Sequence, residues 1–457
     1  MKILYAASEA VPFCKTGGLA DVAGSLPPAL AEQGAETAVI LPLYRRVREK
    51  FADQLTFLCY DYVDLAWRHT YCGLFSMKKD GVTWYFLDNE QYFDRPELYG
   101  YVDDGERFGF FSRAVVKMLD HLEFWPDVIH CNDWQTALIP IYLKDDGVRE
   151  DRYRSIRTVL TIHNIEYQGR YDPYCLGDLF GLDRGWVDDG TLLLDGDLNL
   201  LKGAILTADA VNAVSPTYAQ ELKNPYFAHR MEGILTQCGY KLSGVLNGID
   251  MKLYDPAADG RITANYTAED LSGKAADKTA LQNLMGLNEE PNTPIIAMVS
   301  RLVSHKGLDL LREVMGDIME LPAQFVVLGS GDAGYEEFFR RTAERYPGRM
   351  AVRLGYNEAL SMAIYAGADL FLMPSRSEPC GLSQMISMRY GTVPIVRETG
   401  GLKDTVQPYE AWRDAGTGFT FANYSSADML HVIREAVYLY KDYPDAFARL
   451  RDRAMAQ

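Results

Sequence analysis

The chain has 457 residues with a formal net charge of −17, and 48 % of its residues are hydrophobic. A surface this acidic disfavours binding to nucleic acid and to anionic membranes. No segment approaches the ~20 uncharged apolar residues that a membrane-spanning helix needs, and the first residues (MKILYAASEAVPF) are typical of a buried strand rather than a signal peptide. We therefore expect a cytoplasmic protein with more than one domain.

The cysteines argue against two kinds of stabilising site. There are seven of them, an odd number, and no two are spaced C-x-x-C. A disulfide framework or a zinc site would favour paired spacing. The sequence also shows no carboxylate cluster suited to magnesium, so we expect neither a metal nor a cofactor.

Short apolar runs alternate with helical stretches along the whole chain. In the first half, strands are predicted at 2–7, 36–41, 127–131, 158–163 and 210–214, with helices at 105–121 and 133–143. In the second half, strands are predicted at 294–300, 324–329, 350–355, 369–374 and 393–397, with helices at 306–319 and 335–345. Continuous rather than alternating apolar runs are typical of parallel strands covered on both faces.

Two such series predict two doubly wound α/β domains, 1–245 and 246–457, with a cleft between them. The boundary is placed at the turn signal Asn247-Gly248, which a polar, small-residue stretch follows. Ligands of such sheets bind at the carboxyl ends of the strands. We therefore expect functional residues directly after the predicted strands.

The first strand leads into a glycine-rich loop, Lys15-Thr16-Gly17-Gly18, and then into a helix. The two glycines let the backbone approach a ligand closely. The free N–H groups at a helix start favour an anion, and Lys15 adds a positive charge. The alternative is an ordinary strand–helix turn with a solvated lysine.

Polar residues also end two other strands of the first half. His163 and Asn164 close one strand, and Asp133 follows another. Two polar positions at matching strand ends favour a site over a structural histidine and a helix-capping aspartate, which remain the alternatives.

In the second half, Arg301 and Lys306 flank a strand–helix turn. Cations are unfavourable at a helix N-terminus unless an anion is present, so the pair favours a diphosphate. Residues 329–334 fit G-x-G-x-x-G. They lie in the second strand–helix unit and lack a suitably placed acid, so a tight turn near the phosphates is favoured over a dinucleotide site.

The segment after the strand at 369–374 holds a single glutamate, Glu378, followed by a helix start near Gly381. Helix N–H groups and this carboxylate are suited to sugar hydroxyls. The alternative is a capped turn with a solvated carboxylate. Thr399-Gly400-Gly401 repeats the strand–glycine–helix arrangement and is a further source of N–H donors.

Together these motifs resemble the bacterial glycogen synthase and plant starch synthase family. The resemblance rests on the order and spacing of ten segments: Lys15–Leu19, Thr161–Asn164, Tyr167–Gly169, Val214–Tyr218, Asn247–Asp250, Ser300–Leu302, Lys306-Gly307, Pro374–Arg376, Glu378–Leu382 and Thr399–Leu402. It implies a GT-B fold and transfer of glucose from ADP-glucose to the non-reducing 4-hydroxyl of an α-1,4-glucan, with retention and without a metal.

The resemblance also implies roles for residues. On the phosphate side, Lys15, Arg301 and Lys306 hold the diphosphate and Gly18 lends a backbone donor, with Thr399, Gly400 and Gly401 as the further source of donors. On the sugar side, the expected residues are Asp133, His163, Asn164, Glu378, Cys380, Gly381 and Leu382, with the His163 carbonyl near the anomeric carbon. Gly17, Asp21 and Asn247 are further expected substrate-binding residues. Tyr356 is placed to stack on the base. Of these, Asp133, His163, Arg301, Lys306 and Glu378 are the expected catalytic set.

Two features depart from related patterns. Many relatives with this fold have a second glutamate where this chain has Ile386, a difference that the family often shares. The family usually continues into a last helix that crosses back to the first domain, whereas this chain ends at Gln457.

Three alternatives to an ADP-glucose-dependent glucosyltransferase remain open. They are a non-catalytic glucan or nucleotide-sugar binding protein, a UDP-glucose-dependent enzyme, and an NAD-dependent oxidoreductase using the turn at 329–334.

Overall fold

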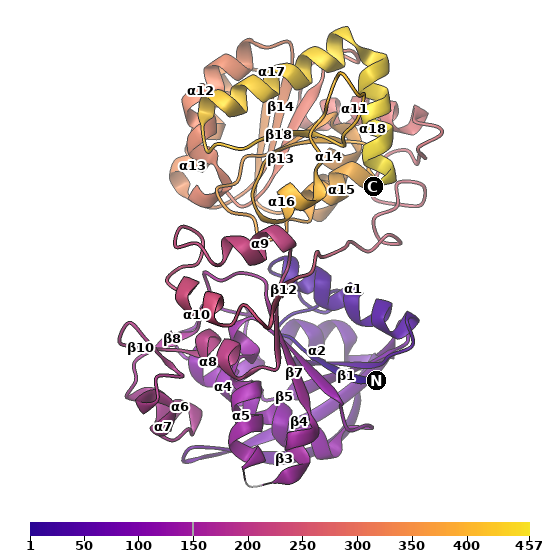
Figure 1. Ribbon diagram of the computed structural model, residues 1–457. Coiled ribbons are helices and arrows are strands. Elements are labelled where there is room, and N and C mark those ends of the chain that lie inside the picture. The colour runs from indigo at the N-terminus through magenta and orange to yellow at the C-terminus, as the bar shows by residue number, and fades with distance from the viewer. Residues whose placement is uncertain (149) are drawn as a thin grey trace. The chain divides into compact units, whose positions relative to one another are not determined.

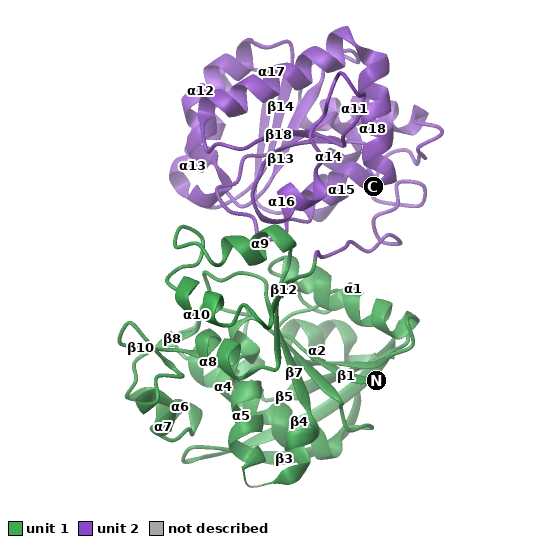
Figure 2. Ribbon diagram, viewed as in Figure 1, with its two compact units in different colours: residues 1–245 green, residues 246–457 purple. Residues whose placement is uncertain are grey.

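A computed structural model describes residues 1–148 and 150–457. The chain divides into two compact units, Met1–Val245 (unit 1) and Leu246–Gln457 (unit 2), which Figure 2 distinguishes by colour. Each unit is a β-sheet with helices packed against it (Figure 1). Within the described residues, no helix is long and apolar enough to cross a membrane.

Unit 1 contains a nine-stranded sheet with the order β12-β11-β7-β6-β1-β2-β5-β4-β3. Its strands are β1 (Lys2–Ala6), β2 (Glu36–Pro42), β3 (Thr56–Leu65), β4 (Arg68–Lys79), β5 (Val82–Asp88), β6 (Val128–Asn132), β7 (Arg157–Ile162), β11 (Ala210–Ala213) and β12 (Leu242–Gly244). The five strands predicted for this half are confirmed as β1, β2, β6, β7 and β11, and they pair in parallel.

The expectation of a purely parallel sheet is wrong for residues 56–88. There β4 pairs antiparallel with both β3 and β5. The side chains of β3 are mostly exposed, and those of β4 are buried over only part of its length. Strands with a solvated face do not form the continuous apolar runs on which the prediction relied.

The helices of unit 1 are α1 (Gly18–Glu32), α2 (Arg45–Phe51), α3 (Glu90–Phe93), α4 (Asp104–Lys117), α5 (Leu138–Gly147), α6 (Cys175–Phe180), α7 (Gly185–Asp188), α8 (Leu200–Thr207), α9 (Pro216–Glu221) and α10 (Glu232–Gln237). A small separate sheet contains β8 (Arg170–Tyr171), β9 (Leu193–Leu194) and β10 (Asp197–Asn199). The helix predicted at 105–121 is confirmed as α4 and a following 3-10 turn. The helix predicted at 133–143 starts later, because a 3-10 turn at Trp134–Thr136 precedes α5.

Unit 2 contains a six-stranded, fully parallel sheet with the order β15-β14-β13-β16-β17-β18. Its strands are β13 (Ile295–Val299), β14 (Gln324–Gly329), β15 (Met350–Leu354), β16 (Leu370–Met373), β17 (Val393–Arg397) and β18 (Phe419–Phe421). Its helices are α11 (Ser272–Met285), α12 (Leu308–Glu320), α13 (Ala333–Arg345), α14 (Glu358–Gly367), α15 (Ser383–Arg389), α16 (Gly400–Thr405), α17 (Ser426–Asp442) and α18 (Pro444–Ala456).

The core of unit 2 lies on both faces of its sheet. Along β13, Ile296 and Met298 join one apolar cluster, which contains residues of α12 and α17. The alternate residues Ile295 and Ala297 join a second cluster with residues of α11 and α14. Successive side chains of a strand point to opposite faces, which explains why the central strands β13 and β16 are apolar at every position.

The parallel strands of both sheets follow one order. Numbered along the chain, those of unit 2 run third, second, first, fourth, fifth, sixth. Those of unit 1, without the β3–β4 hairpin, run in the same order with a seventh strand added at β12. This is the dinucleotide-binding type of doubly wound sheet, whose ligands bind where the strand order reverses. The reversal lies between β1 and β6 in unit 1 and between β13 and β16 in unit 2.

Candidate active site

The predicted functional residues gather at these two reversal points. In unit 1, the loop with Lys15 follows β1 and Asp133 follows β6, while His163 follows the neighbouring β7. In unit 2, Arg301 and Lys306 follow β13 and Glu378 follows β16. Side chains from distant parts of the sequence are therefore brought to one edge of each sheet.

The glycine-rich loop of unit 1 ends on the start of α1, with Gly17 in extended conformation before the first helical residue, Gly18. Lys15 Nζ lies 2.7 Å from Asp21 Oδ1, and both side chains are part-exposed. This ion pair connects the loop to the first turn of the helix. It gives Asp21, a residue expected at the site, a defined role in orienting Lys15.

A buried carboxyl lies beneath this loop that the sequence analysis missed. Glu9, only 3 % exposed, accepts hydrogen bonds from Thr16 N and Thr16 Oγ1 at 2.5 and 2.8 Å. It also accepts the N–H of Gly17, and burial raises the pKa of Glu9 to about 7. The pattern used for the other site residues, a polar residue just after an apolar strand, would also have indicated Glu9.

Asp133 connects β6 to the residues after β7. Its Oδ1 accepts the backbone N–H of His163 at 2.7 Å and that of Asn164 at 3.3 Å. The carboxyl is buried, and this burial raises its pKa to about 7. Asp133 has φ 54° and ψ −170°, a conformation that costs non-glycine residues of order 1–3 kcal/mol. The fold thus maintains a strained residue where its carboxyl fixes the neighbouring chain.

The imidazole of His163 is held by Asn132. The amide of Asn132 donates through Nδ2 to the carbonyl of Ala6, so its Oδ1 is the acceptor for Tyr5 Oη and for His163 Nε2, each at 2.9 Å. Nε2 therefore carries the proton of a neutral ring. Burial lowers the pKa of His163 to about 3, which keeps it neutral at physiological pH. Asn132 is a second residue that the sequence analysis missed.

In unit 2 the structure brings together Lys306 and Glu378, which are 72 residues apart in the sequence. Lys306 Nζ lies 2.7 Å from Glu378 Oε2, and the side chains are 17 % and 10 % exposed. Ser375 Oγ donates to the same oxygen at 3.0 Å. Burial alone would raise the pKa of Glu378, but Lys306 and Ser375 hold it below its ordinary value. The carboxyl of Glu378 therefore stays ionised.

Glycines set the distance between these turns. Gly307, with φ 75°, follows Lys306, and a Cβ there would lie 2.0 Å from the carbonyl oxygen of Pro374. A Cβ on Gly400 would meet the carbonyl oxygen of Glu378 at 2.0 Å, and one on Gly401 would meet that of Cys380 at 2.1 Å. Only glycine fits where backbones pack this closely. These glycines therefore allow the turn after Lys306 and the start of α16 to pack directly against residues 374–380, the segment that contains Glu378.

Gly401 donates its N–H within the protein. Its acceptors are the carbonyls of Glu378, at 3.2 Å, and Pro379, at 3.1 Å. The N–H of Gly401 is therefore engaged in holding the Glu378 segment. The N–H of Thr399 is engaged as well, since it donates to the carbonyl of Arg397 at 2.9 Å. The expectation that this turn offers N–H donors to phosphate stays a prediction for Gly400.

The G-x-G-x-x-G turn also serves packing. A Cβ on Gly329 would lie 1.9 Å from the carbonyl oxygen of Ser300, and one on Gly331 would lie 2.4 Å from that of Leu302. Leu302 N donates to Ser330 O, and Asp332 N donates to Leu302 O, both at 2.8 Å. The turn therefore braces the segment that presents Arg301, an exposed residue.

Most of the remaining predicted residues of unit 2 lie beside Cys380. Its buried thiol is hydrogen-bonded by Asn247, and burial raises the pKa of the thiol to about 12. Gly381 has φ 70°, and the side chain of Gln384 donates to the carbonyls of Cys380 and Gly381, both at 3.0 Å. Leu382 directly precedes α15, and Tyr356 is 69 % exposed in the loop between β15 and α14.

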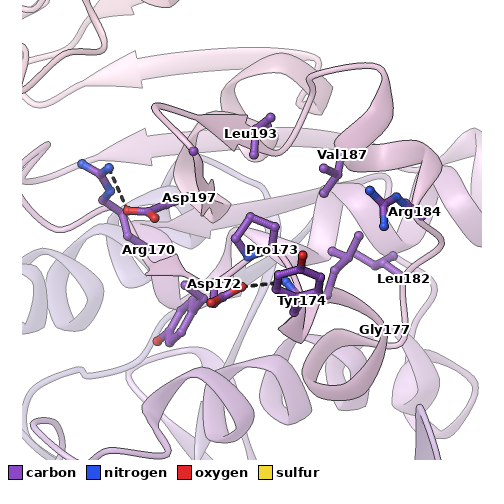
Figure 3. A pocket seen from close by; sticks show the side chains of 13 residues that line it. Arg170, Asp172, Pro173, Tyr174, Gly177, Leu182, Arg184, Val187, Leu193 and Asp197 are labelled. Atoms are coloured by element: carbon purple, nitrogen blue, oxygen red, sulfur yellow. Dashed lines mark hydrogen bonds and ion pairs between the residues drawn. The ribbon is translucent and has the colours of Figure 1, made fainter.

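A separate surface hollow of about 800 Å³ lies in unit 1 beside β8 and α6 (Figure 3). Arg170 and Asp197, which form an ion pair at 2.9 Å, and the ring of Tyr174 are among its lining residues. None of the predicted site residues lines it.

Comparison with known proteins agrees with this arrangement. The family model described as the starch synthase catalytic domain matches residues 2–237, and the one described as glycosyl transferases group 1 matches residues 284–448. Sucrose-phosphate synthase from Thermosynechococcus elongatus has a TM-score of 0.59 at 17 % identity, covering 100 % of this chain and 94 % of that one, a likeness of fold alone. The chain is thus a GT-B glycosyltransferase with two Rossmann-like domains.

Relatives of nearly equal length narrow this class. Glycogen synthases from Bacillus cereus and Ligilactobacillus salivarius are each 47 % identical, over 100 % of this chain and 96 % of theirs. The catalytic domain of starch synthase IV from Arabidopsis thaliana, bound to ADP and acarbose, has a TM-score of 0.91 at 33 % identity, covering 100 % of this chain and 95 % of that one. The chain belongs to the glycogen synthase and starch synthase family, and the resemblance inferred from its motifs is confirmed.

Proposed function

We propose that this glucosyltransferase transfers glucose from ADP-glucose to the non-reducing 4-hydroxyl of an α-1,4-glucan in the cytoplasm, with retention of the anomeric configuration. The observation that carries the proposal is the ion pair of Lys306 and Glu378 at the reversal point of the unit 2 sheet. The chain has a net charge of −17, so an anionic ligand must be bound by a local positive charge. Lys306, held in place near a helix start, provides such a charge. The solved relative bound to ADP supports the choice of nucleotide.

Breaking the bond between glucose and phosphate builds negative charge on the departing diphosphate. Lys306 and Arg301 neutralise that charge from unit 2, and Lys15 with the N–H group of Gly18 does so from the glycine-rich loop, while the N–H of Gly17 is accepted by Glu9. Fixed cations and helix N-termini stabilise such charge without reorganising during the reaction. This role requires that the lysines be positioned in advance, which Glu378 and Asp21 achieve through the ion pairs described above.

The sugar is held by neutral and acidic groups. Lys306 and Ser375 both bind Oε2 of Glu378, which leaves Oε1 to accept a glucose hydroxyl, beside the backbone of Cys380, Gly381 and Leu382. Asp133 fixes the backbone of His163 and Asn164, so these residues present a defined surface to the reacting glucose. His163 is neutral, and it contributes polar contacts, including its carbonyl near the anomeric carbon, rather than positive charge.

Among the described residues, the two carboxylates placed beside the glucose are already engaged, Glu378 by Lys306 and Asp133 by backbone N–H groups, which disfavours either as a covalent nucleophile. We infer front-face attack, in which the acceptor 4-hydroxyl adds to the anomeric carbon on the side from which the diphosphate leaves. The leaving phosphate oxygen takes the acceptor's proton, so the bond to ADP breaks as the new glycosidic bond forms. Exclusion of water makes the glucan the acceptor.

The test supplies ADP-glucose and UDP-glucose separately, each with glycogen, and measures polymer growth and release of the nucleoside diphosphate. We expect growth with ADP-glucose and a product that α-specific glucan hydrolases degrade fully. Growth with UDP-glucose alone would overturn the donor assignment, β-linked product would overturn retention, and binding without transfer would identify a non-catalytic glucan-binding protein.

A further inference from the structure

We propose that Glu9 is a positioning residue that holds the glycine-rich loop in its ligand-binding conformation. The inference rests on the proposed function for its kinetic test, but the hydrogen bonds that carry it belong to the fold itself. A single carboxyl accepts two consecutive backbone N–H groups, of Thr16 and Gly17, and the hydroxyl of Thr16. These residues lie between Lys15 and Gly18, at the centre of the loop.

The position of Glu9 explains how so short a loop keeps its shape. A Cβ placed on Gly17 would lie 3.8 Å from Glu9 Oε1, so the carboxyl packs directly against the loop backbone. On the other side, Val11 N donates to Ala20 O at 3.0 Å, which attaches the loop to α1. Glu9 thus supplies the acceptors that the loop cannot find in a sheet or helix.

The surroundings of Glu9 are unfavourable for a carboxylate. The titratable side chains around it are Asp21 from α1, Cys14 from the loop, Asp133 after β6, Tyr44 before α2 and Tyr99 before α4, and burial keeps the thiol and the two phenols uncharged by raising the pKa of each. None is a cation, and Lys15 is paired with Asp21. Tyr44 Oη is buried without a hydrogen-bond partner, and Tyr99 Oη is bonded to Ser8 Oγ at 2.7 Å. A buried carboxyl maintained in such surroundings indicates a function that outweighs its cost in stability.

The protonation state of Glu9 therefore matters to the loop. Its pKa, raised from 4.5 to about 7 by burial, means that the acid is neutral below this value and ionised above it. Because its folded-state pKa exceeds the unfolded value, protonation favours the fold at low pH, and this contribution is lost as the pH rises through about 7. The ionised form, with two strong acceptor oxygens, is the one that binds the loop N–H groups.

The experiment compares the wild-type protein with Glu9→Gln from pH 6 to pH 8. At pH 8 we expect kcat/KM for the donor sugar to fall at least ~10-fold in the variant, since a small misplacement of a binding group is enough for such a loss. At pH 6 the two proteins should converge, because the wild-type carboxyl is then largely protonated. The apparent Tm of the variant, relative to wild type, should rise between pH 6 and pH 8.

Three variants complete the design. Thr16→Val, which removes one donor, should lose less activity than Glu9→Gln, and Thr16→Ser should restore it. Asp277→Asn is the matched control, because Asp277 is a buried acid of unit 2 that accepts the N–H groups of Thr263 and Ala264 at 2.8 and 3.1 Å. It should change stability while leaving the ratio of its kcat/KM to that of wild type constant with pH.

A pH-independent ratio between wild type and Glu9→Gln, or an equal ratio for Asp277→Asn, would overturn the proposal. Hydrogen exchange at the amides of Thr16 and Gly17 provides a readout that does not depend on turnover. At pH 8 these amides should exchange faster in Glu9→Gln than in wild type, and unchanged exchange would also overturn it. If wild type transfers no glucose but the exchange result holds, the proposed function fails while the role of Glu9 stands.

Discussion

The two units place carboxylates at equivalent strand ends but use them in opposite ways. In unit 1, Glu9 after β1 and Asp133 after β6 accept backbone N–H groups, and burial raises the pKa of each to about 7. In unit 2, Glu378 after β16 is just as buried but lies 2.7 Å from Lys306, and its pKa is lowered instead. One sheet topology therefore supports two kinds of preorganisation, one of the main chain and one of a charge.

The difference follows from the groups that each unit offers to a ligand: backbone N–H groups and carbonyls in unit 1, and a charged side chain in unit 2. In unit 1 the carboxylates have no cation as a partner and accept backbone N–H groups instead. They therefore fix the conformation of the glycine-rich loop and of residues His163 and Asn164. A carboxylate with a cation fixes that cation in space, so unit 2 fixes Lys306 where a diphosphate binds. Substitutions that remove one kind of support should leave signatures distinct from those of the other.

The largest effect is expected for Lys306→Ala. This change removes a fixed positive charge from the leaving group, and loss of one such donor typically costs ~10²–10³-fold in rate. We expect kcat/KM for ADP-glucose to fall at least ~100-fold while circular dichroism and the apparent Tm show a folded protein. Near-normal turnover would remove Lys306 from the mechanism and with it the charge-fixing role of unit 2.

Lys278 provides the matched control for Lys306. Its Nζ lies 2.8 Å from Asp369 Oδ2 in the same unit, with side chains 8 % and 12 % exposed. This pair is as buried as Lys306–Glu378 but is not part of the predicted site. Lys278→Ala should lower stability by ~3 kcal/mol or more, because it leaves a buried charge unpaired, yet the folded fraction should keep its kcat/KM.

Glu378→Gln tests the partner of the same pair. The amide leaves the charge of Lys306 uncompensated and weakens the acceptor for glucose, so we expect a loss of ~100-fold in kcat/KM. Because the pKa of Glu378 is lowered, the wild-type carboxyl is ionised throughout pH 6–8, and the loss should be the same at every pH in this range. A loss that disappears at pH 6 would mean that Glu378 behaves like the carboxyls of unit 1.

The contact that brings Lys306 to Glu378 can be broken at Gly307. Alanine there would place its Cβ 2.0 Å from the carbonyl oxygen of Pro374, at φ 75°. We expect a loss of ~2 kcal/mol or more in the free energy of unfolding, together with lower activity because the Lys306 turn moves. Gly316→Ala, in the middle of α12 where nothing lies within 4 Å, should instead stabilise by ~0.5–1 kcal/mol. Urea denaturation of both variants distinguishes the two sites.

The sequence predicts much of this architecture because buried parallel strands are recognisable one at a time. The ten predicted strands are present, and polar residues after them, such as Asp133 and Lys306, lie where the strand order reverses. The β3–β4 hairpin escaped prediction because its exposed strands follow a different pattern. Strand existence is a local property, and it is therefore accessible from a single sequence.

Which of these residues form ion pairs and hydrogen bonds with each other was not predictable, because these contacts depend on the order of strands in the sheet. Lys306 and Glu378 are 72 residues apart, and Asp133 and His163 are 30 apart. Nothing in the sequence near Asp133 indicates that its carboxyl binds the backbone of another strand end rather than capping its own helix. Glu9 was also missed, although Thr16, which donates to its carboxyl, lies only seven residues away.

The smallest effect on activity is expected for Asp133→Gly, and it is the substitution that best separates a loss of activity from a loss of stability. Asp133→Gly relieves a backbone conformation that only glycine adopts readily (φ 54°, ψ −170°), but it removes the acceptor for the N–H groups of His163 and Asn164. We expect kcat/KM to fall ~10-fold, since the loop loses a charge-assisted bond, with the apparent Tm unchanged or raised. Asp80→Gly, at φ 53° in the β4–β5 turn, is the control and should leave activity intact. If Asp133→Gly lost stability and activity in proportion, the carboxyl would serve the fold alone, and the contrast between the units would rest on Glu9.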